Sequence, residues 1–186
     1  MGAARHRAIC AGREARLIPR RRVGGIIERQ GHMTTAQPAW RIAASAPIAR
    51  TISSIAVHCT ATREGQPFHV ADVRAWHKAQ GWSDIGYHFL VALDGDIEVG
   101  RPKAQVGAHV AGHNSQSIGI VYVGGVAKDG RTPKDTRTSE QKAAMVDLLR
   151  VLKAAHPGAI IQGHRDYPKV AKACPSFDAK REYAAL

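Results

Sequence analysis

The sequence predicts an α/β domain in which a mixed β-sheet is flanked by helices. The predicted strands are short apolar runs bounded by polar or glycine-rich residues, at 54–60, 86–93, 96–99, 118–123 and 159–162. The predicted helices carry apolar residues about every 3.6 positions, at 70–80 and 138–156. Strands and helices alternate imperfectly, which is typical of a mixed sheet with helices packed on it. A chain of 186 residues, 44% of them hydrophobic, can form one domain with its own core.

Residues 1–50 are the part of the chain that this pattern leaves outside the domain. Residues 1–32 hold eight arginines against two glutamates and show no sustained period of 2 or 3.6. We expect residues 1–50 to form a basic, disordered extension, with 40–50 as a linker or edge segment, and the folded domain to span 51–186. A translation start at Met33 would remove most of the extension. A basic arm that binds a partner is the alternative.

Composition limits the function classes. The chain carries +12 at pH 7, and half of this excess lies in residues 1–32. The rest favours an anionic partner, such as nucleic acid, anionic lipid or an acidic cell-wall polymer, without choosing among them. Three scattered cysteines do not predict a disulfide framework, so a reducing compartment is expected. No apolar run approaches the roughly 18 residues of a membrane span, and no secretion signal is recognisable, so we expect no export route of its own.

The first predicted strand, at 54–60, separates two potentially reactive side chains. Alternation places Cys59 on one face with Ile55 and Val57, and leaves His58 on the other face. Free cysteine is commonly buried, so we expect Cys59 in the core.

The next two elements are a helix and a hairpin. The apolar stripe at 70–80 predicts a helix that ends at Gly81. His77 on this stripe and His69 before it are interpreted as packed or half-exposed surface histidines, because nothing nearby completes a metal set. The Asp94-Gly95 pair is typical of a hairpin turn.

Within the first strand of that hairpin, Tyr87 shares a face with Phe89 and Val91. Aromatic packing is therefore the plain structural interpretation of Tyr87. The glycine-rich loop that follows contains His109 and His113, which are further candidates for metal binding or substrate contact.

The second half of the chain predicts a central strand, a long helix and a last strand. The apolar run at 118–123 is bounded by glycines, as in a buried strand. Thr138 and Gln141 predict a capping box for a helix that runs to about His156. The short strand at 159–162 then delivers His164.

Three residues far apart in the sequence form the candidate metal site. His58 lies near the end of the first strand, His164 follows the last strand, and Cys174 comes ten positions later. Catalytic zinc typically takes three protein ligands from His, Cys and carboxylate and leaves one position open for water. The sequence therefore predicts a zinc site formed by these three residues.

The same segments resemble the zinc-dependent type 2 N-acetylmuramoyl-L-alanine amidases, a family that includes phage amidase lysozymes and animal peptidoglycan recognition proteins. The resemblance covers roughly residues 54–177. Its five pieces, in the family's order, are Val57-His-Cys-Thr-Ala-Thr62, Trp82-Ser-Asp-Ile-Gly-Tyr-His-Phe89, Gly107 to Asn114 with Ser117-Ile-Gly-Ile120, Gly163-His-Arg-Asp166 and Lys172-Ala-Cys-Pro175. It implies a sheet of five or six strands flanked by helices, with the zinc in a surface cleft.

Carried over residue by residue, the resemblance implies one Zn²⁺ per chain, held by His58, His164 and Cys174. It makes Tyr87 a catalytic tyrosine near the open coordination position and Lys172 a catalytic lysine. No His-Glu-x-x-His helix and no obvious carboxylate motif for a general base is present.

The resemblance also implies a substrate and a biological role. His109, His113 and Asn114 are implied to help line a groove for peptidoglycan (murein), and the reaction is cleavage of the amide bond between N-acetylmuramic acid and L-alanine. Related wall-recycling amidases tend to carry a carboxylate in place of Cys174, and recognition proteins that bind without cutting lack the cysteine, so its presence favours catalysis. The small size resembles a phage or prophage endolysin. Such an enzyme waits in the host cytoplasm until a separate protein permeabilises the membrane. We expect a monomer without stable membrane insertion.

Two other interpretations stay open. A binding module would recognise peptidoglycan without hydrolysis, although Tyr87, Lys172 and Cys174 argue against it. A nucleic-acid binder with a structural zinc would depend on the arginine-rich start and show salt-sensitive affinity. We expect no nucleic-acid partner.

Overall fold

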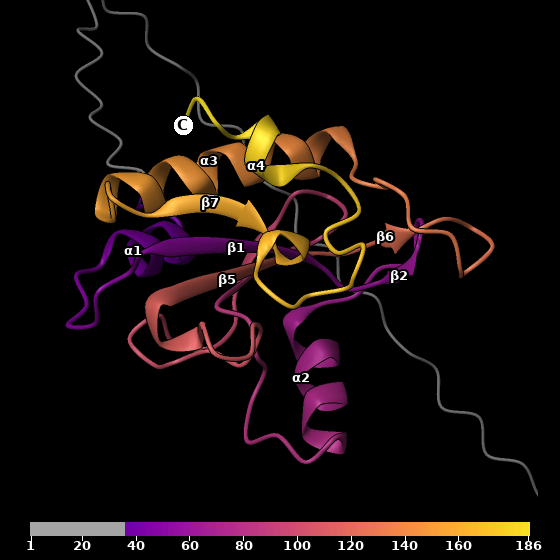
Figure 1. Ribbon diagram of the computed structural model, residues 1–186, viewed down its shortest axis with the longest axis horizontal. Helices are drawn as coiled ribbons and strands as arrows, with labels where there is room; N and C mark the ends of the chain where they lie inside the picture. The colour runs from indigo at the N-terminus through magenta and orange to yellow at the C-terminus, as the bar shows by residue number, and fades with distance from the viewer. Residues whose placement is uncertain (1–35) are drawn as a thin grey trace, which may run out of the picture. The chain divides into compact units, whose positions relative to one another are not determined.

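A five-stranded mixed sheet organises residues 36–186, the part of the chain that the computed structural model describes (Figure 1). Its strands are β1 (Ser54–Cys59), β3 (Phe89–Val91), β4 (Ile97–Val99), β5 (Ser117–Tyr122) and β7 (Ile160–Gly163). The spatial order is β4-β3-β5-β1-β7, and β4 is antiparallel to β3 whereas the other pairs are parallel. The predicted mixed sheet is confirmed. The disorder expected for residues 1–35 and the alternative start at Met33 concern residues outside the described range.

Helices cover both sides of this sheet. They are α1 (Ala39–Ser45), α2 (Val70–Ala79), α3 (Ser139–Ala155) and α4 (Ala179–Glu182), with short 3₁₀ helices η1 (Asn114–Gln116) and η2 (His164–Asp166). A separate two-stranded parallel sheet joins β2 (Thr62–Arg63) to β6 (Gly125–Val126). Figure 1 shows α3 and α4 on one side of the large sheet and α2 on the other. Among residues 36–186, no helix has both the length and the apolar character that crossing a bilayer requires.

The side of the sheet that faces α3, here called the core face, carries the larger apolar cluster. Its members come mainly from alternate strand residues and from the buried stripe of α3, and they include Ile55, Val57, Cys59, Phe89, Val91, Ile118, Ile120, Met145, Leu148, Leu149 and Leu152. The predicted capping box is present, because Thr138 Oγ1 accepts from Gln141 N and Gln141 Oε1 accepts from Thr138 N. Gln141 also donates to the carbonyl oxygens of Val91 and Val123, which fixes the start of α3 against the sheet.

The opposite side, here called the site face, carries the other alternate residues: Ala56 and His58 of β1, His88 and Leu90 at β3, and Gly119 and Val121 of β5. Val70 and Val73 of α2 pack with its apolar members. The expected grouping of Tyr87 with Phe89 and Val91 is wrong, because Tyr87 packs on this side and they lie on the core face. The regular strand begins only at Phe89, since Gly86 bonds to His77 Nδ1 and to the loop at Ala108.

The folded region also begins earlier than expected. Residues Ala39–Ser45 form helix α1 where a linker or edge segment was predicted, and Ala44 is fully buried in the core. Lys103 Nζ donates to the carbonyl oxygen of Ala44 at 2.5 Å, and Arg50 donates to that of Lys103 at 2.9 Å. These partners lie more than 50 positions apart in the sequence. The compact unit therefore begins at Ala36 instead of residue 51.

Candidate metal centre and active site

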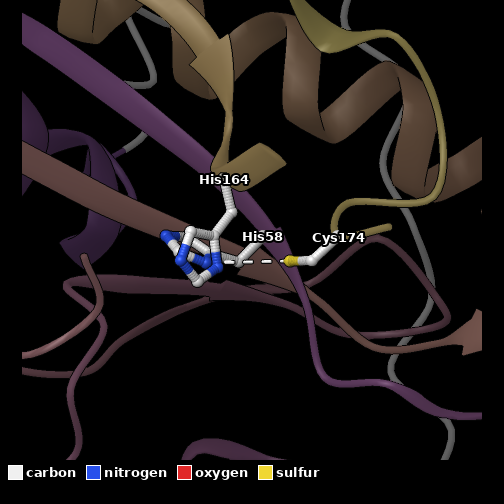
Figure 2. Close-up of side chains that lie close together, drawn as sticks. All are labelled: His58, His164 and Cys174. Atoms are coloured by element: carbon white, nitrogen blue, oxygen red, sulfur yellow. Dashed lines mark hydrogen bonds between the residues drawn. The ribbon is translucent and has the colours of Figure 1, made fainter. Parts of the chain in front are cut away.

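Two neighbouring parallel strands deliver two of the predicted metal ligands. His58 is near the end of β1, and His164 directly follows β7, with Val57 paired to Gly163. Because parallel strands run in the same direction, their carboxyl ends meet at one edge of the sheet. The two imidazole rings consequently lie beside each other, with centroids 4.6 Å apart (Figure 2).

The third predicted ligand, Cys174, comes from the loop after η2. Its Sγ lies 3.8 Å from His58 Nδ1, and the potential ligand atoms of the three residues all lie within 4.8 Å of one another (Figure 2). Two hydrogen bonds to this loop hold it in place: Arg165 N donates to Cys174 O at 2.8 Å, and Tyr122 Oη donates to Pro175 O at 2.7 Å.

Gly163 makes the approach of this loop possible. A Cβ atom at position 163 would lie 2.6 Å from Pro175 Cδ, closer than real side chains approach. The backbone N–H of Gly163 donates to Asp166 Oδ2 at 2.8 Å, which also fixes the turn that carries His164. The absence of a side chain at residue 163 therefore brings Cys174 up to the end of β7.

The donor set fits a zinc ion. Zn–N distances of about 2.0–2.1 Å and a Zn–S distance of about 2.3 Å give a nitrogen–sulfur separation of about 3.6 Å in a tetrahedral site. The 3.8 Å between His58 Nδ1 and Cys174 Sγ is close to that value. His58 is buried, whereas His164 and Cys174 are partly exposed. The cluster is therefore anchored in the protein interior at His58 and accessible to solvent at the other two residues. No other group of three or more potential ligands gathers in this way within residues 36–186.

Both histidines of the cluster favour the neutral form that metal binding requires. Burial holds the pKa of His58 well below its ordinary value, and the charges of His109, His164 and Lys172 act in the same direction. Burial, and then the charge of Lys172, also lowers the pKa of His164. The Lys172 ammonium is thus close enough to act electrostatically on both rings.

The two cysteines of the described region lie next to each other, and the loop that carries Cys174 packs against the core cluster to which Cys59 belongs. Cys59 is 5% exposed and packs in the core, as predicted. Its backbone N–H donates to Cys174 Sγ at 3.4 Å. The Cys59 side chain and burial raise the pKa of the Cys174 thiol, and this backbone N–H acts in the opposite direction, toward the thiolate that binds metals.

Tyr87 lies against the ring of His58, with centroids 5.1 Å apart. Burial is the main cause that raises the pKa of Tyr87, and negative charge on Cys174 would raise it further. The phenol therefore keeps its proton at neutral pH and remains a hydrogen-bond donor beside the metal cluster.

A groove of about 980 Å³ opens beside His164. One wall is the loop at residues 108–114 and the other is the segment at 168–172, with Trp82 completing the lining. Lys172 lies on the second wall and is exposed. A volume of this size is at the upper end of the range for ligand pockets.

The loop wall carries the three residues expected to contact substrate, and His109, His113 and Asn114 all line the groove. Asn114 has a local role as well, since its Oδ1 accepts from the backbone N–H groups of His109 and Val110, each at 2.8 Å. Asn114 therefore shapes the wall on which the two histidines stand.

Residues 48–177 match the family model described as N-acetylmuramoyl-L-alanine amidase, which covers more than half of the chain. The chain belongs to this amidase family. The endolysin of Klebsiella phage KP32 is 46% identical over 129 residues, which are 69% of this chain and 83% of that protein. The endolysin of Escherichia phage T7 is 43% identical over 128 residues, with the same two coverages. The family and enzyme class predicted from the sequence are confirmed.

A solved structure supports the fold of this amidase. The N-acetylmuramoyl-L-alanine amidase LysC from Clostridium intestinale URNW superposes with a TM-score of 0.60 at 27% identity, over 75% of this chain and 87% of that one. Zinc dependence is typical of the family, and the His-His-Cys cluster of this amidase has the donor set that zinc prefers.

Several residues that support the amidase site were not recognised from the sequence. His77, interpreted as a packed or half-exposed surface histidine, is half-buried against Trp82, and it also accepts from Gly86 N at 2.9 Å, which holds the segment before Tyr87. Arg50 donates to the carbonyl oxygens of Asn114, Ser115 and Ser117, where the groove loop ends. These contacts join distant segments, and no local sequence pattern indicates them.

Proposed function

We propose that this protein is a zinc-dependent endolysin that hydrolyses the amide bond between N-acetylmuramic acid and L-alanine in peptidoglycan. The observation that carries the proposal is the meeting of His58, His164 and Cys174 beside a groove of about 980 Å³, in a chain of the amidase family. Three nitrogen and sulfur ligands of this kind leave the fourth coordination position of a zinc ion free for water or substrate.

His58, His164 and Cys174 would hold the metal. Zinc bound there would act as a Lewis acid on the scissile carbonyl and lower the pKa of bound water to about 7. Two neutral imidazoles and one thiolate leave a site charge of about +1. His58 is buried inside the protein, whereas His164 lines the groove, so substrate in the groove would approach the metal from the side of His164.

Tyr87 would stabilise the charge that develops on the substrate. Hydrolysis of an amide converts the carbonyl oxygen into an oxyanion, and a preorganised donor next to it lowers the barrier. The Tyr87 phenol is enclosed beside His58, and burial keeps it protonated. The protonated phenol can therefore donate a hydrogen bond to the oxyanion from the position that it already occupies.

Lys172 would supply positive charge from the groove wall. Its side chain is exposed at the groove next to His164, and its charge acts on both metal-binding histidines. An ammonium in this position favours an oxyanion over the neutral carbonyl. No Asp or Glu lines the described groove, and Lys169 adds a second cation, so the lining favours a substrate with carboxylates, as peptidoglycan stem peptides have.

The endolysin role rests on the phage relatives, which are named endolysins. In that role the protein would be made in the host cytoplasm and act on the periplasmic cell wall after release, as a monomer without membrane insertion. The competing role is a recognition module that binds peptidoglycan without cutting. The complete ligand set, with Tyr87 and Lys172 beside it, favours hydrolysis.

The test is digestion of purified Gram-negative murein, with products identified by mass. We expect release of free stem peptides that stops after chelation and returns when zinc is added. Binding to murein without release would replace the proposal by the recognition role. Neither binding nor release would overturn both.

A further inference from the structure

His109, a candidate for metal binding or substrate contact from the sequence, contacts the metal ligand His58 directly. Its side chain is almost fully enclosed, and its Nδ1 lies 3.2 Å from His58 Nε2. The two rings meet edge to face, at 82° and with centroids 5.2 Å apart. His58 thus presents Nδ1 to Cys174 and Nε2 to His109.

The direction of these hydrogen bonds follows from the proposed metal site. If His58 Nδ1 binds zinc, the proton of the neutral ring is on Nε2 and can only be donated, so His109 Nδ1 must accept it. His109 then carries its own proton on Nε2, which lies 3.5 Å from Ser117 Oγ. Ser117 Oγ in turn donates to His113 O at 2.8 Å. In this series of hydrogen bonds from His58 to His113 O, every donor has an acceptor, and all the bonds run in the same direction.

Two glycines create the space that the His109 ring occupies. A Cβ atom at Gly107 or at Gly119 would lie 2.6 Å from His109 Cδ2. Gly119 belongs to β5 and pairs with Ala56 of β1, so the ring lies over β5, next to the strand that carries His58. Its backbone is held as well, through the Asn114 side chain. The position of His109 is therefore determined from several sides.

We propose that His109 is a positioning residue for the metal centre, which holds the His58 ring in place and fixes the tautomer that presents Nδ1 to the zinc. This inference rests on the proposed zinc site. Groups that hydrogen-bond the far nitrogen of a metal-binding histidine orient the ring and strengthen metal binding.

The test is zinc affinity of the purified full-length protein, measured by competition with a chromophoric chelator. His109→Phe keeps a planar ring but has no acceptor, and we expect its zinc dissociation constant to rise about 10–100-fold. His109→Gln retains an acceptor oxygen and should recover most of that loss. The absorption bands of the Co²⁺-substituted protein should shift in His109→Phe and stay near the parent position in His109→Gln, because ligand geometry depends on the hydrogen bond.

Two further measurements separate this role from simple packing. His113→Phe, a change to the same loop, should leave zinc affinity unchanged. The thermal midpoint of the zinc-free protein reports any packing defect of His109→Phe directly. Parent-like zinc affinity in His109→Phe, or an equal loss in His109→Phe and His109→Gln, would overturn the positioning role.

A separate control tests the metal site itself. The parent should bind one zinc per chain, and Cys174→Ser should bind it much more weakly. If the parent binds no zinc, or if Cys174→Ser binds it as well as the parent, the proposed zinc centre fails, and the role of His109 fails with it. If these controls hold and only the His109 series contradicts expectation, the zinc centre stands and the inference about His109 alone is wrong.

Discussion

The two faces of the central sheet are built from the same strands but contain different chemistry. The core face, toward α3, is filled by aliphatic and aromatic side chains. The site face holds three buried histidines, His58, His88 and His109, and burial lowers the pKa of each. Successive residues of β1 alternate between the faces, so His58 and Cys59 are chain neighbours with opposite surroundings. The comparison shows that the core face stabilises the fold, whereas the site face holds polar side chains in fixed positions.

The strongest test of this division is a matched pair of cysteine changes. Cys174→Ser removes a predicted metal ligand, and we expect amidase activity to fall by more than about 10³-fold, beyond the loss of a single oxyanion donor. Cys59→Ser makes the same chemical change at a core residue that is not a predicted ligand, and it should retain zinc binding while lowering stability by at most about 1–3 kcal/mol, because the buried hydroxyl would have Ser176 Oγ as a polar neighbour. Stem-peptide release and bound zinc are the measurements. A Cys174→Ser enzyme that remains active and zinc-loaded would contradict the assignment.

A second test changes the site face without touching a metal ligand. Tyr87→Phe loses only a hydroxyl, so we expect zinc affinity to remain and kcat to fall about 10²–10³-fold, as on removal of one oxyanion donor. The measurement is turnover on murein, with bound zinc determined on the same preparation. Undiminished turnover would assign Tyr87 to packing against His58.

The core face should respond in the opposite way. Leu149 of α3 is fully buried in the core-face cluster. We expect Leu149→Ala to lower the free energy of unfolding by about 2–5 kcal/mol, because it removes buried methyl groups and leaves a cavity. Urea unfolding measures this change, and the zinc dissociation constant of the folded variant should equal that of the parent. A large loss of zinc affinity at full stability would mean that the two faces are coupled.

The smallest expected effect is the pH dependence that a buried histidine adds. Burial lowers the pKa of His88 to about 4, and its neutral ring accepts from Gly119 N at 2.9 Å. Between pH 6.5 and about 4 the unfolded chain binds a proton that folded His88 does not, so stability falls as the pH is lowered through this range, by up to about 3 kcal/mol. His88→Asn keeps an acceptor for Gly119, and urea unfolding at several pH values should give a shallower dependence for the zinc-free variant. Equal slopes for variant and parent would rule out this contribution.

Local patterns in the sequence were sufficient for much of the fold and for the candidate residues. Period-two alternation separated His58 from Cys59, and the capping box located the start of α3 at Thr138. Both features depend on neighbours within four residues, and for that reason the sequence shows them directly. The candidate ligands were found because His and Cys at the ends of apolar runs are unusual and chemically specific.

Only the tertiary structure determined the contacts between segments that are distant in the sequence. Helix α1 is held by Lys103, the loop of Cys174 reaches β7 because Gly163 has no side chain, and His109 stands behind His58. Tyr87 changes faces for the same kind of reason, since Gly86 bonds to distant partners and interrupts the strand pattern. Periodicity records which way a side chain points along its own element, but it does not record which distant atom it meets. Contacts between distant side chains form only when the sheet assembles and the parallel strands bring their carboxyl ends together.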